Sequence, residues 1–242
     1  MRYCVLIPAH NEAGTIRQVV EGALCHVDHV IVVNDGSTDE TVAALDGVAI
    51  ELLDHAENRG KGQRLSEGID HAIAAGFDGV LTLDADMQHD PDDIPAFLAA
   101  AQADPEAFIL GDRFSDNASM PRGRAFGIRF GDFFVGWSIE RRLRDAQCGM
   151  RLYPASLWKR TAVPDDLQAH FVFETAVLLH AAEAGCRFVR VPIAARYSGF
   201  VSRPSHYRPF TDTWSIVCAI TKFIVRRRFK LRGLLIAVGL LR

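Results

Sequence analysis

Two aspartates separated by one residue, Asp84 and Asp86, are the side chains in this sequence best suited to bind a divalent cation. They come directly after an apolar run at residues 80–83, and Gln88 adds a further oxygen two positions later. Mg²⁺ and Mn²⁺ prefer one or two carboxylates completed by water and substrate phosphates. The pattern predicts a Mg²⁺ or Mn²⁺ site at these three residues. The alternative is a solvated acidic turn before the next helix.

Three other polar clusters also follow short apolar runs. They are His10-Asn11-Glu12, Asp35-Gly36-Ser37 and Asn58-Arg59-Gly60-Lys61-Gly62. The third combines glycines with basic side chains before a helical pattern, which is typical of a phosphate-binding loop at a helix N-terminus, although it lacks the GxxxxGK[ST] spacing. Each cluster alone could be an ordinary turn. Because parallel strands end at one edge of a sheet, we expect all four clusters to meet in one crevice.

Basic and acidic side chains that could serve an acceptor or a proton transfer occur later in the chain. The arginines and histidine expected in or near loops are Arg113, Arg122, Arg124, Arg129, Arg151, Arg203 and His206. A guanidinium suits bidentate binding of a phosphate, and a solvated surface is the alternative for about half of them. Asp145 and Glu174 are candidates for a general base. The alternative for Glu174 is a carboxylate that stabilises the start of a helix.

Apolar runs alternate with helical patterns over the first 111 residues. We predict strands near residues 3–8, 30–33, 50–53, 80–83 and 108–110, and helices near 16–24, from 38–40 onward, 65–73 and 94–101. This order is the signature of an α/β fold with a mostly parallel sheet covered on both faces. Beyond it we expect a polar, mobile loop at 112–125, helices near 126–143 and 173–184, and strands at 187–191 and 193–197.

The chain has 242 residues and a formal charge of −3, which argues against a nucleic-acid partner. Residues 213–242 contain seven Lys and Arg and no Asp or Glu, so the preceding 212 residues carry the negative charge. We therefore divide the chain into a domain at 1–212 and a basic, apolar tail at 213–242. The tail lacks the ~20 apolar residues of a spanning helix. We expect it to lie on an anionic membrane surface. Its apolar face would comprise Trp214, Val217, Ile220, Phe223 and Ile224; packing of this segment on the protein's own core is the alternative.

Cysteine usage and the first residues indicate the compartment. The five cysteines are an odd number, are widely spaced and form no CxxC, which favours reduced thiols over disulfides or zinc. The first residues resemble a core strand and do not resemble a secretory signal. We expect a cytoplasmic protein that associates peripherally with the cytoplasmic membrane.

Three motifs together resemble family 2 glycosyltransferases of the GT-A fold. They are Ile7-Pro8-Ala9-His10-Asn11-Glu12, Val33-Asn34-Asp35-Gly36-Ser37-Thr38-Asp39 and Leu83-Asp84-Ala85-Asp86-Met87-Gln88-His89-Asp90-Pro91. The Gln88-His89 extension and the 58–62 loop are most similar to the polyprenyl-phosphate sugar transferase branch, which includes dolichyl-phosphate mannosyltransferase. Gly111-Asp112-Arg113 and Gly149-Met150-Arg151 continue the likeness, the latter in place of the usual Gly-Phe-Arg. The resemblance covers roughly residues 3–200.

The resemblance implies a UDP- or GDP-sugar donor, a divalent metal and a lipid acceptor. The donor-binding residues would be Pro8, His10, Asn11, Glu12, Asp35, Gly36, Asn58, Lys61 and Asp84. Arg113 would lie near the acceptor phosphate, and the acceptor group would also include Arg129, Arg151, Arg203, Ser205 and His206. Asp86, Arg113, Asp145 and Glu174 are the catalytic candidates. An anionic phosphate acceptor needs no strong base, whereas a hydroxyl acceptor would need Glu174 or Asp145.

Three alternatives remain at this point. The same fold could glycosylate a hydroxyl of another lipid or of a polyketide-like acceptor. A sugar-phosphate nucleotidylyltransferase usually carries a glycine- and arginine-rich loop directly after the first strand, whereas this chain has His10-Asn11-Glu12 there. A membrane-associated nucleotide-binding module without activity would be expected to have lost the metal motif, which is intact.

Overall fold

The structure is a computed structural model that describes residues 1–114, 122–161, 163, 172–194, 217–218, 220–225 and 231–241. Its strands are β1 (Tyr3–Ala9), β2 (Val30–Asp35), β3 (Glu51–His55), β4 (Gly79–Thr82), β5 (Phe108–Asp112), β6 (Arg151–Pro154) and β7 (Phe188–Pro192). Its α-helices are α1 (Ile16–Leu24), α2 (Lys61–Ala74), α3 (Ile94–Ala103), α4 (Arg122–Ile139), α5 (Ala155–Trp158), α6 (Val172–Glu183) and α8 (Leu231–Ala237). Short 3₁₀ helices are η1 (Ala43–Leu45) and η2 (Pro91–Asp93).

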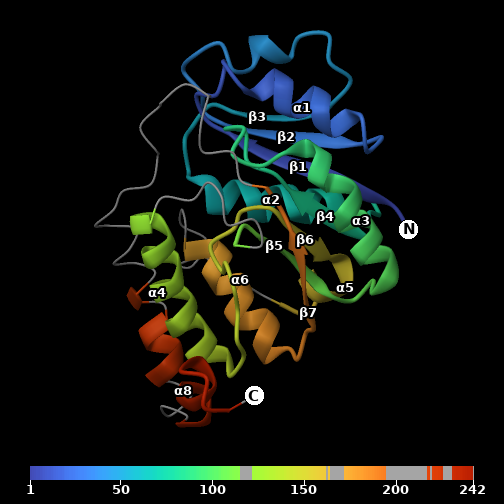
Figure 1. Cartoon of the computed structure of the whole chain (residues 1–242). Helices are drawn as coiled ribbons and strands as arrows, with labels where there is room; N and C mark the ends of the chain where they lie inside the picture. Colours follow the sequence, from blue (N-terminus) through green and yellow to red (C-terminus); the bar gives the residue numbers. More distant parts are fainter. Residues whose placement is uncertain are drawn as a thin grey trace.

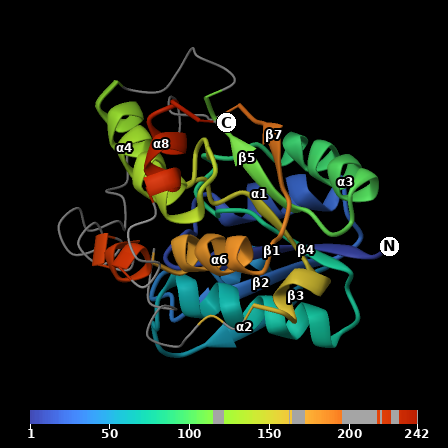
Figure 2. The ribbon, with the colours of Figure 1, turned by 90° about the horizontal axis from the view of Figure 1, so that it is seen from below.

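Within the described residues, seven strands form one sheet in the order β3-β2-β1-β4-β6-β5-β7 (Figure 1). Strands β1, β2 and β4 consist of apolar runs whose residues are almost all buried, because helices cover both faces of the sheet. Helices α1 and α3 pack on one face, and α2 and α6 pack on the other (Figure 2). This arrangement confirms the predicted α/β class and the mostly parallel sheet.

The expected strand-end geometry depends on the parallel register of the first strands. β1 pairs in parallel with β2 and β4, and β2 pairs in parallel with β3. Their carboxyl ends therefore lie at one edge, and the loops after β1, β2, β3 and β4 emerge together there. Helices α4 and α8 lie together on the side of the molecule opposite the N-terminus (Figure 1).

Three local predictions differ from the structure. β6 was not predicted; it inserts between β4 and β5 and runs antiparallel to both. The helix expected from residues 38–40 does not form; the Asp39 carboxylate accepts the backbone N–H of Thr41, and only the short η1 follows. Residues 193–194 are not in a strand, and 195–197 lie outside the described residues. Half of the expected loop at 112–125, residues 115–121, also lies outside them, and its last residues, from 122 onward, begin α4.

The tail departs from the expected membrane-facing arrangement. Ile220, Phe223 and Ile224 are buried in the same core cluster as α6, and the Phe223 ring lies 6.5 Å from that of His180. These three side chains therefore stabilise the domain and cannot insert into a bilayer in this arrangement. Trp214 lies outside the described residues, and Val217 is exposed. No helix in the described part of the chain is both long and apolar enough to span a membrane.

Candidate active site

The carboxylate of Asp84, which follows β4, lies at the centre of the candidate site. Its Oδ1 is 2.7 Å from Nζ of Lys61, and the same ammonium is 2.9 Å from Oε1 of Glu174. Burial alone would raise the pKa of Asp84, but the charge and hydrogen bond of Lys61, together with the charges of His89 and Arg113, outweigh burial and lower that pKa to about 2. Lys61 begins α2, and Glu174 lies in the first turn of α6. The ammonium of Lys61 therefore links α2, α6 and the loop after β4.

Backbone just before β6 closes tightly on the other oxygen of Asp84. A Cβ added at Gly149 would lie 2.6 Å from Oδ2 of Asp84, so this position has no room for a side chain unless the carboxylate moves. The Thr82 hydroxyl donates a 2.7 Å hydrogen bond to the carbonyl of Gly149, which ties β4 to this segment. The glycine therefore sets where the carboxylate lies.

The second aspartate of the pair is held by the turn that contains it. Oδ1 of Asp86 accepts a 3.0 Å hydrogen bond from the backbone N–H of Gln88, and Met87 between them has a left-handed φ of 62°. Burial and the neighbouring charge of Asp84 raise the pKa of Asp86 to about 6. The two carboxylates thus repel each other in a confined place, and a cation between them would relieve that repulsion.

This donor set fits a divalent cation that is bound jointly with a substrate. In the described part of the chain, no group of three or more His, Cys, Asp or Glu side chains could hold a metal alone. Two carboxylates and the side-chain oxygen of Gln88 leave the remaining ligands to water and phosphate oxygens, as Mg²⁺ and Mn²⁺ commonly require. The residues present therefore match the chemistry of a metal–diphosphate site.

The loops after β1 and β2 are bound to each other. Asn11 has a left-handed φ of 56°, and its Oδ1 accepts the backbone N–H groups of Thr38 at 2.7 Å and Asp39 at 3.3 Å. The backbone N–H of Asn11 donates to Oγ of Ser37, and Nδ1 of His10 lies 2.9 Å from the carbonyl of Asp35. Pro8 and Glu12 are half-buried beside them. The structure thus brings the first two predicted clusters together.

Asp35 has a different environment from the one expected for a nucleoside ligand. Its Oδ1 accepts from the backbone of Arg59 and from Nε of Arg64, and its Oδ2 accepts from the backbone of Gly60. The carboxylate is buried and anchors the loop that precedes Lys61. Gly36 allows this approach, because a Cβ there would lie 2.7 Å from the backbone nitrogen of Asn58.

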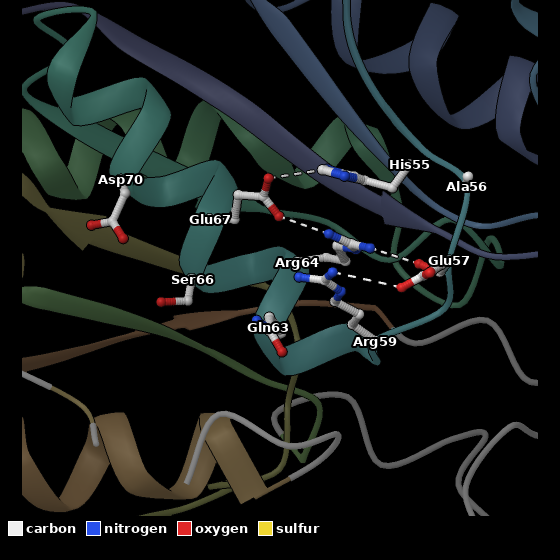
Figure 3. Close-up of a pocket in the computed structure, with 9 residues that line it drawn as sticks. All are labelled: His55, Ala56, Glu57, Arg59, Gln63, Arg64, Ser66, Glu67 and Asp70. Atoms are coloured by element: carbon white, nitrogen blue, oxygen red, sulfur yellow. Dashed lines mark hydrogen bonds and ion pairs between the residues drawn. The ribbon is translucent and has the colours of Figure 1, made fainter. Parts of the chain in front are cut away.

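A surface pocket lies on the outer side of the same loop (Figure 3). It is lined by His55, Ala56, Glu57, Arg59, Gln63, Arg64, Ser66, Glu67 and Asp70. Its charges pair with one another: Arg64 contacts Glu67 at 2.8 Å, and His55 contacts the same carboxylate at 3.1 Å. The guanidinium of Arg64 also donates to the carbonyl of Glu57. Of the lining residues, Arg59 alone belongs to a predicted cluster, and the paired charges leave the pocket as support for the start of α2.

Arg113 and Asp145 form a buried bidentate pair beyond the metal motif. Nε and Nη2 of Arg113 lie 2.7 and 2.6 Å from Oδ2 and Oδ1 of Asp145, respectively. Asp132 of α4 accepts the backbone N–H groups of Asp145 and Ala146, and this fixes the turn. Asp145 is 1% exposed and both of its oxygens are occupied. This pairing argues against the expected role of Asp145 as a base; in this structure the residue positions Arg113.

Arg151 also has a structural environment. Its guanidinium donates to the carbonyls of Cys148, Glu174 and Ala146, and the side chain is fully buried. It is therefore not available to an acceptor phosphate, contrary to expectation. Arg129 is exposed on α4, 5.3 Å from the ring of Phe114. Other expected positions, Arg203, Ser205 and His206, lie outside the described residues; Arg122 and Arg124 begin α4.

Sequence reasoning missed three residues that shape the site. Arg64 anchors Asp35, Asp132 holds the turn of Asp145, and the buried ring of His89 lies behind Asp84. Burial lowers the pKa of His89 to about 4. The adjacency of His89 to the metal motif was visible in the sequence, whereas no local pattern marks the other two.

Comparison with known proteins places these features in a family. Residues 4–161 match the sequence model of Glycosyl transferase family 2. UDP-N-acetylglucosamine–dolichyl-phosphate N-acetylglucosaminyltransferase of Methanococcus voltae is 28% identical over 179 residues, which cover 64% of this chain and 70% of that protein. Polyprenol monophosphomannose synthase of Mycolicibacterium smegmatis is 24% identical over 203 residues, which cover 79% of this chain and 76% of that protein.

A solved structure has the same fold. The crystal structure of glucosyl-3-phosphoglycerate synthase from Mycobacterium tuberculosis in complex with Mn²⁺, UDP-glucose and phosphoglyceric acid matches with a TM-score of 0.65. The match covers 93% of this chain and 79% of that chain at 18% identity. At this identity the likeness establishes the architecture alone, and it confirms the GT-A fold expected from the sequence.

Proposed function

Because the chain belongs to glycosyl transferase family 2, we propose that it transfers a sugar from a UDP- or GDP-sugar to a polyprenyl phosphate with inversion of the anomeric carbon. The named relatives that act on dolichyl or polyprenyl carriers support the acceptor class. The observation that carries the proposal is the Lys61–Asp84–Glu174 cluster at the strand ends, where a cation and paired carboxylates meet.

Donor binding uses the loops around this cluster. We place the nucleoside between the loops after β1 and β2 and the diphosphate near Lys61 and the N-terminus of α2, where backbone N–H groups and the helix dipole favour anions. Asp84, Asp86 and Gln88 would hold Mg²⁺ or Mn²⁺. When bound, that ion neutralises the diphosphate as it leaves. Lys61 adds a second positive charge at the same place.

The pairing of the acidic side chains favours a phosphate acceptor over a hydroxyl. A hydroxyl nucleophile needs a carboxylate that is free to take its proton, but Glu174 is paired with Lys61 and Asp145 is paired with Arg113. A lipid phosphate is already anionic, and its oxygen attacks the anomeric carbon as the bond to the diphosphate breaks. We propose that Arg113, whose guanidinium is held by Asp145, contacts that phosphate. The family match also argues against the nucleotidylyltransferase alternative.

Released nucleoside diphosphate measures the proposed reaction. The purified chain is incubated with UDP- and GDP-sugars and Mn²⁺, with and without a short polyprenyl phosphate. One donor should yield nucleoside diphosphate in an acceptor-dependent manner. A polyprenol of the same length, which lacks the phosphate, is the matched control. Turnover with the alcohol and none with the phosphate would contradict the acceptor assignment.

We also propose that the enzyme works from the cytoplasmic face, with α4 and the exposed side chains of the tail on the membrane. Apart from Met1, the large apolar side chains exposed in the described structure all lie in α4 or beyond residue 216. They are Phe126, Phe130, Val217, Val225, Leu231, Val238, Leu240 and Leu241. The basic residues of the tail stand near this set in sequence. An apolar face beside cations suits an anionic leaflet.

Vesicle flotation tests the membrane surface. The protein should float with vesicles that contain anionic lipid and not with neutral vesicles, and added salt should weaken binding. Phe126→Ser with Phe130→Ser, which alters side chains that are 72% and 54% exposed, should reduce the bound fraction several-fold. Lys159→Gln, which alters an exposed side chain outside α4 and the tail, is the control. Unchanged flotation of the double variant would remove α4 from the membrane surface.

A further inference from the structure

His89 lies directly behind the first aspartate of the metal motif, inside the core. The residue is 2% exposed, and its Nδ1 makes no hydrogen bond within the described part of the chain. That nitrogen faces Oδ2 of Asp84 at 3.7 Å, while Nε2 lies 3.7 Å from Sγ of Cys148. A buried polar atom without a partner is costly, so one that faces a charged site is expected to find its partner there.

The other surroundings of Asp84 restrict where its carboxylate can go. Oδ1 contacts Lys61 at 2.7 Å, and Gly149 closes the space beside Oδ2. The imidazole of His89 is a further polar neighbour, on the buried side. A shift of about 1 Å would bring Nδ1 and Oδ2 to hydrogen-bond distance.

We infer that His89 is a positioning residue whose Nδ1–H donates to Oδ2 of Asp84 and so directs Oδ1 toward the divalent cation. The nitrogen that faces the anionic carboxylate carries the proton, since a lone pair there would be repelled. Nε2 is then left as an acceptor for the thiol of Cys148. Outer partners of this kind hold metal ligands in orientation, and their loss typically costs 10–100-fold in metal affinity. This inference rests on the proposed metal–nucleotide site.

Two substitutions separate orientation from packing. His89→Leu fills much of the ring volume but removes the donor. His89→Asn places an amide N–H close to the position of Nδ1. We would measure Mn²⁺ binding by electron paramagnetic resonance in the presence of UDP and, separately, GDP, and thermal unfolding of each variant. His89→Leu should weaken Mn²⁺ binding about tenfold or more. His89→Asn should stay within about threefold of the original chain.

Two results would overturn the inference. One is Mn²⁺ binding by His89→Leu equal to that of the original chain. The other is an equal loss in both variants, which would assign His89 to core packing. The original chain is measured first, and its failure to bind Mn²⁺ with either nucleotide would remove the proposed metal site and this inference together. If the original chain binds Mn²⁺ but the variants give either of these two results, only the inference about His89 fails, and the proposed function stays in place.

Discussion

Asp86→Asn is expected to lower turnover by about 10²–10³-fold, the typical loss for a positioned electrostatic group. The amide keeps the shape of the side chain but removes one of the two negative charges that face the cation. Folding should be preserved, because burial and the charge of Asp84 already disfavour the ionised carboxylate and raise its pKa to about 6. Turnover is measured as released nucleoside diphosphate at saturating Mn²⁺, and thermal unfolding checks the fold.

A matched control is available six residues further along. Asp92→Asn makes the same chemical change in a side chain that is 81% exposed and lies outside the site. It should retain normal turnover. Normal turnover by Asp86→Asn, or full activity of the unaltered chain in excess EDTA, would contradict the assignment of a metal to this motif.

Substitutions at Arg113 and Glu174 should separate the two kinds of acceptor. Arg113→Ala should impair use of a lipid phosphate, but it also leaves Asp145 buried without its partner, which is strongly destabilising. Arg113→Lys retains the charge and loses the bidentate geometry. We expect it to lower kcat/KM for the acceptor by about 10–100-fold, the equivalent of one charge-assisted hydrogen bond, with nucleotide-sugar binding near normal.

Glu174→Gln is the comparison variant, and its effect should be mild. The amide oxygen can still accept from Lys61, and a phosphate acceptor has no proton for Glu174 to remove. Initial rates are measured against both substrates, and donor affinity is measured by direct titration. If Glu174→Gln abolishes transfer while Arg113→Lys has little effect, the hydroxyl-acceptor mechanism replaces the one proposed here.

The strands and the order of the first elements could be predicted because they depend on local sequence. Continuous apolar runs mark β1, β2 and β4, which are buried on both faces. β6 has no such signal: its sequence, Arg-Leu-Tyr-Pro, contains a guanidinium that is buried because three backbone carbonyls accept from it, those of Ala146 and Cys148 just before the strand and that of Glu174 in α6. Its antiparallel pairing with β4 is a long-range contact that no local pattern encodes.

The candidate site, too, could be predicted from the sequence only in part. The strand-end rule placed Asp84 and Lys61 in one crevice, and the structure brings them within 2.7 Å. Which side chains in that crevice are already paired depends on tertiary contacts. Asp145 meets Arg113 across 32 residues of sequence and is held by Asp132 of α4. Likewise, the apolar periodicity of residues 213–225 is equally consistent with a core helix and a membrane helix, and only packing against α6 decides for Ile220 and Phe223.

The chemical form of the product tests the central claim most directly. After reaction with the accepted nucleotide sugar and a short polyprenyl phosphate, the lipid is extracted and analysed by ³¹P NMR and mass spectrometry. We predict that the phosphomonoester signal is replaced by a phosphodiester and that the lipid mass increases by one sugar. A product that retains its phosphomonoester and carries the sugar on a hydroxyl, or an unmodified lipid after the nucleotide has been released, would contradict the proposed transfer.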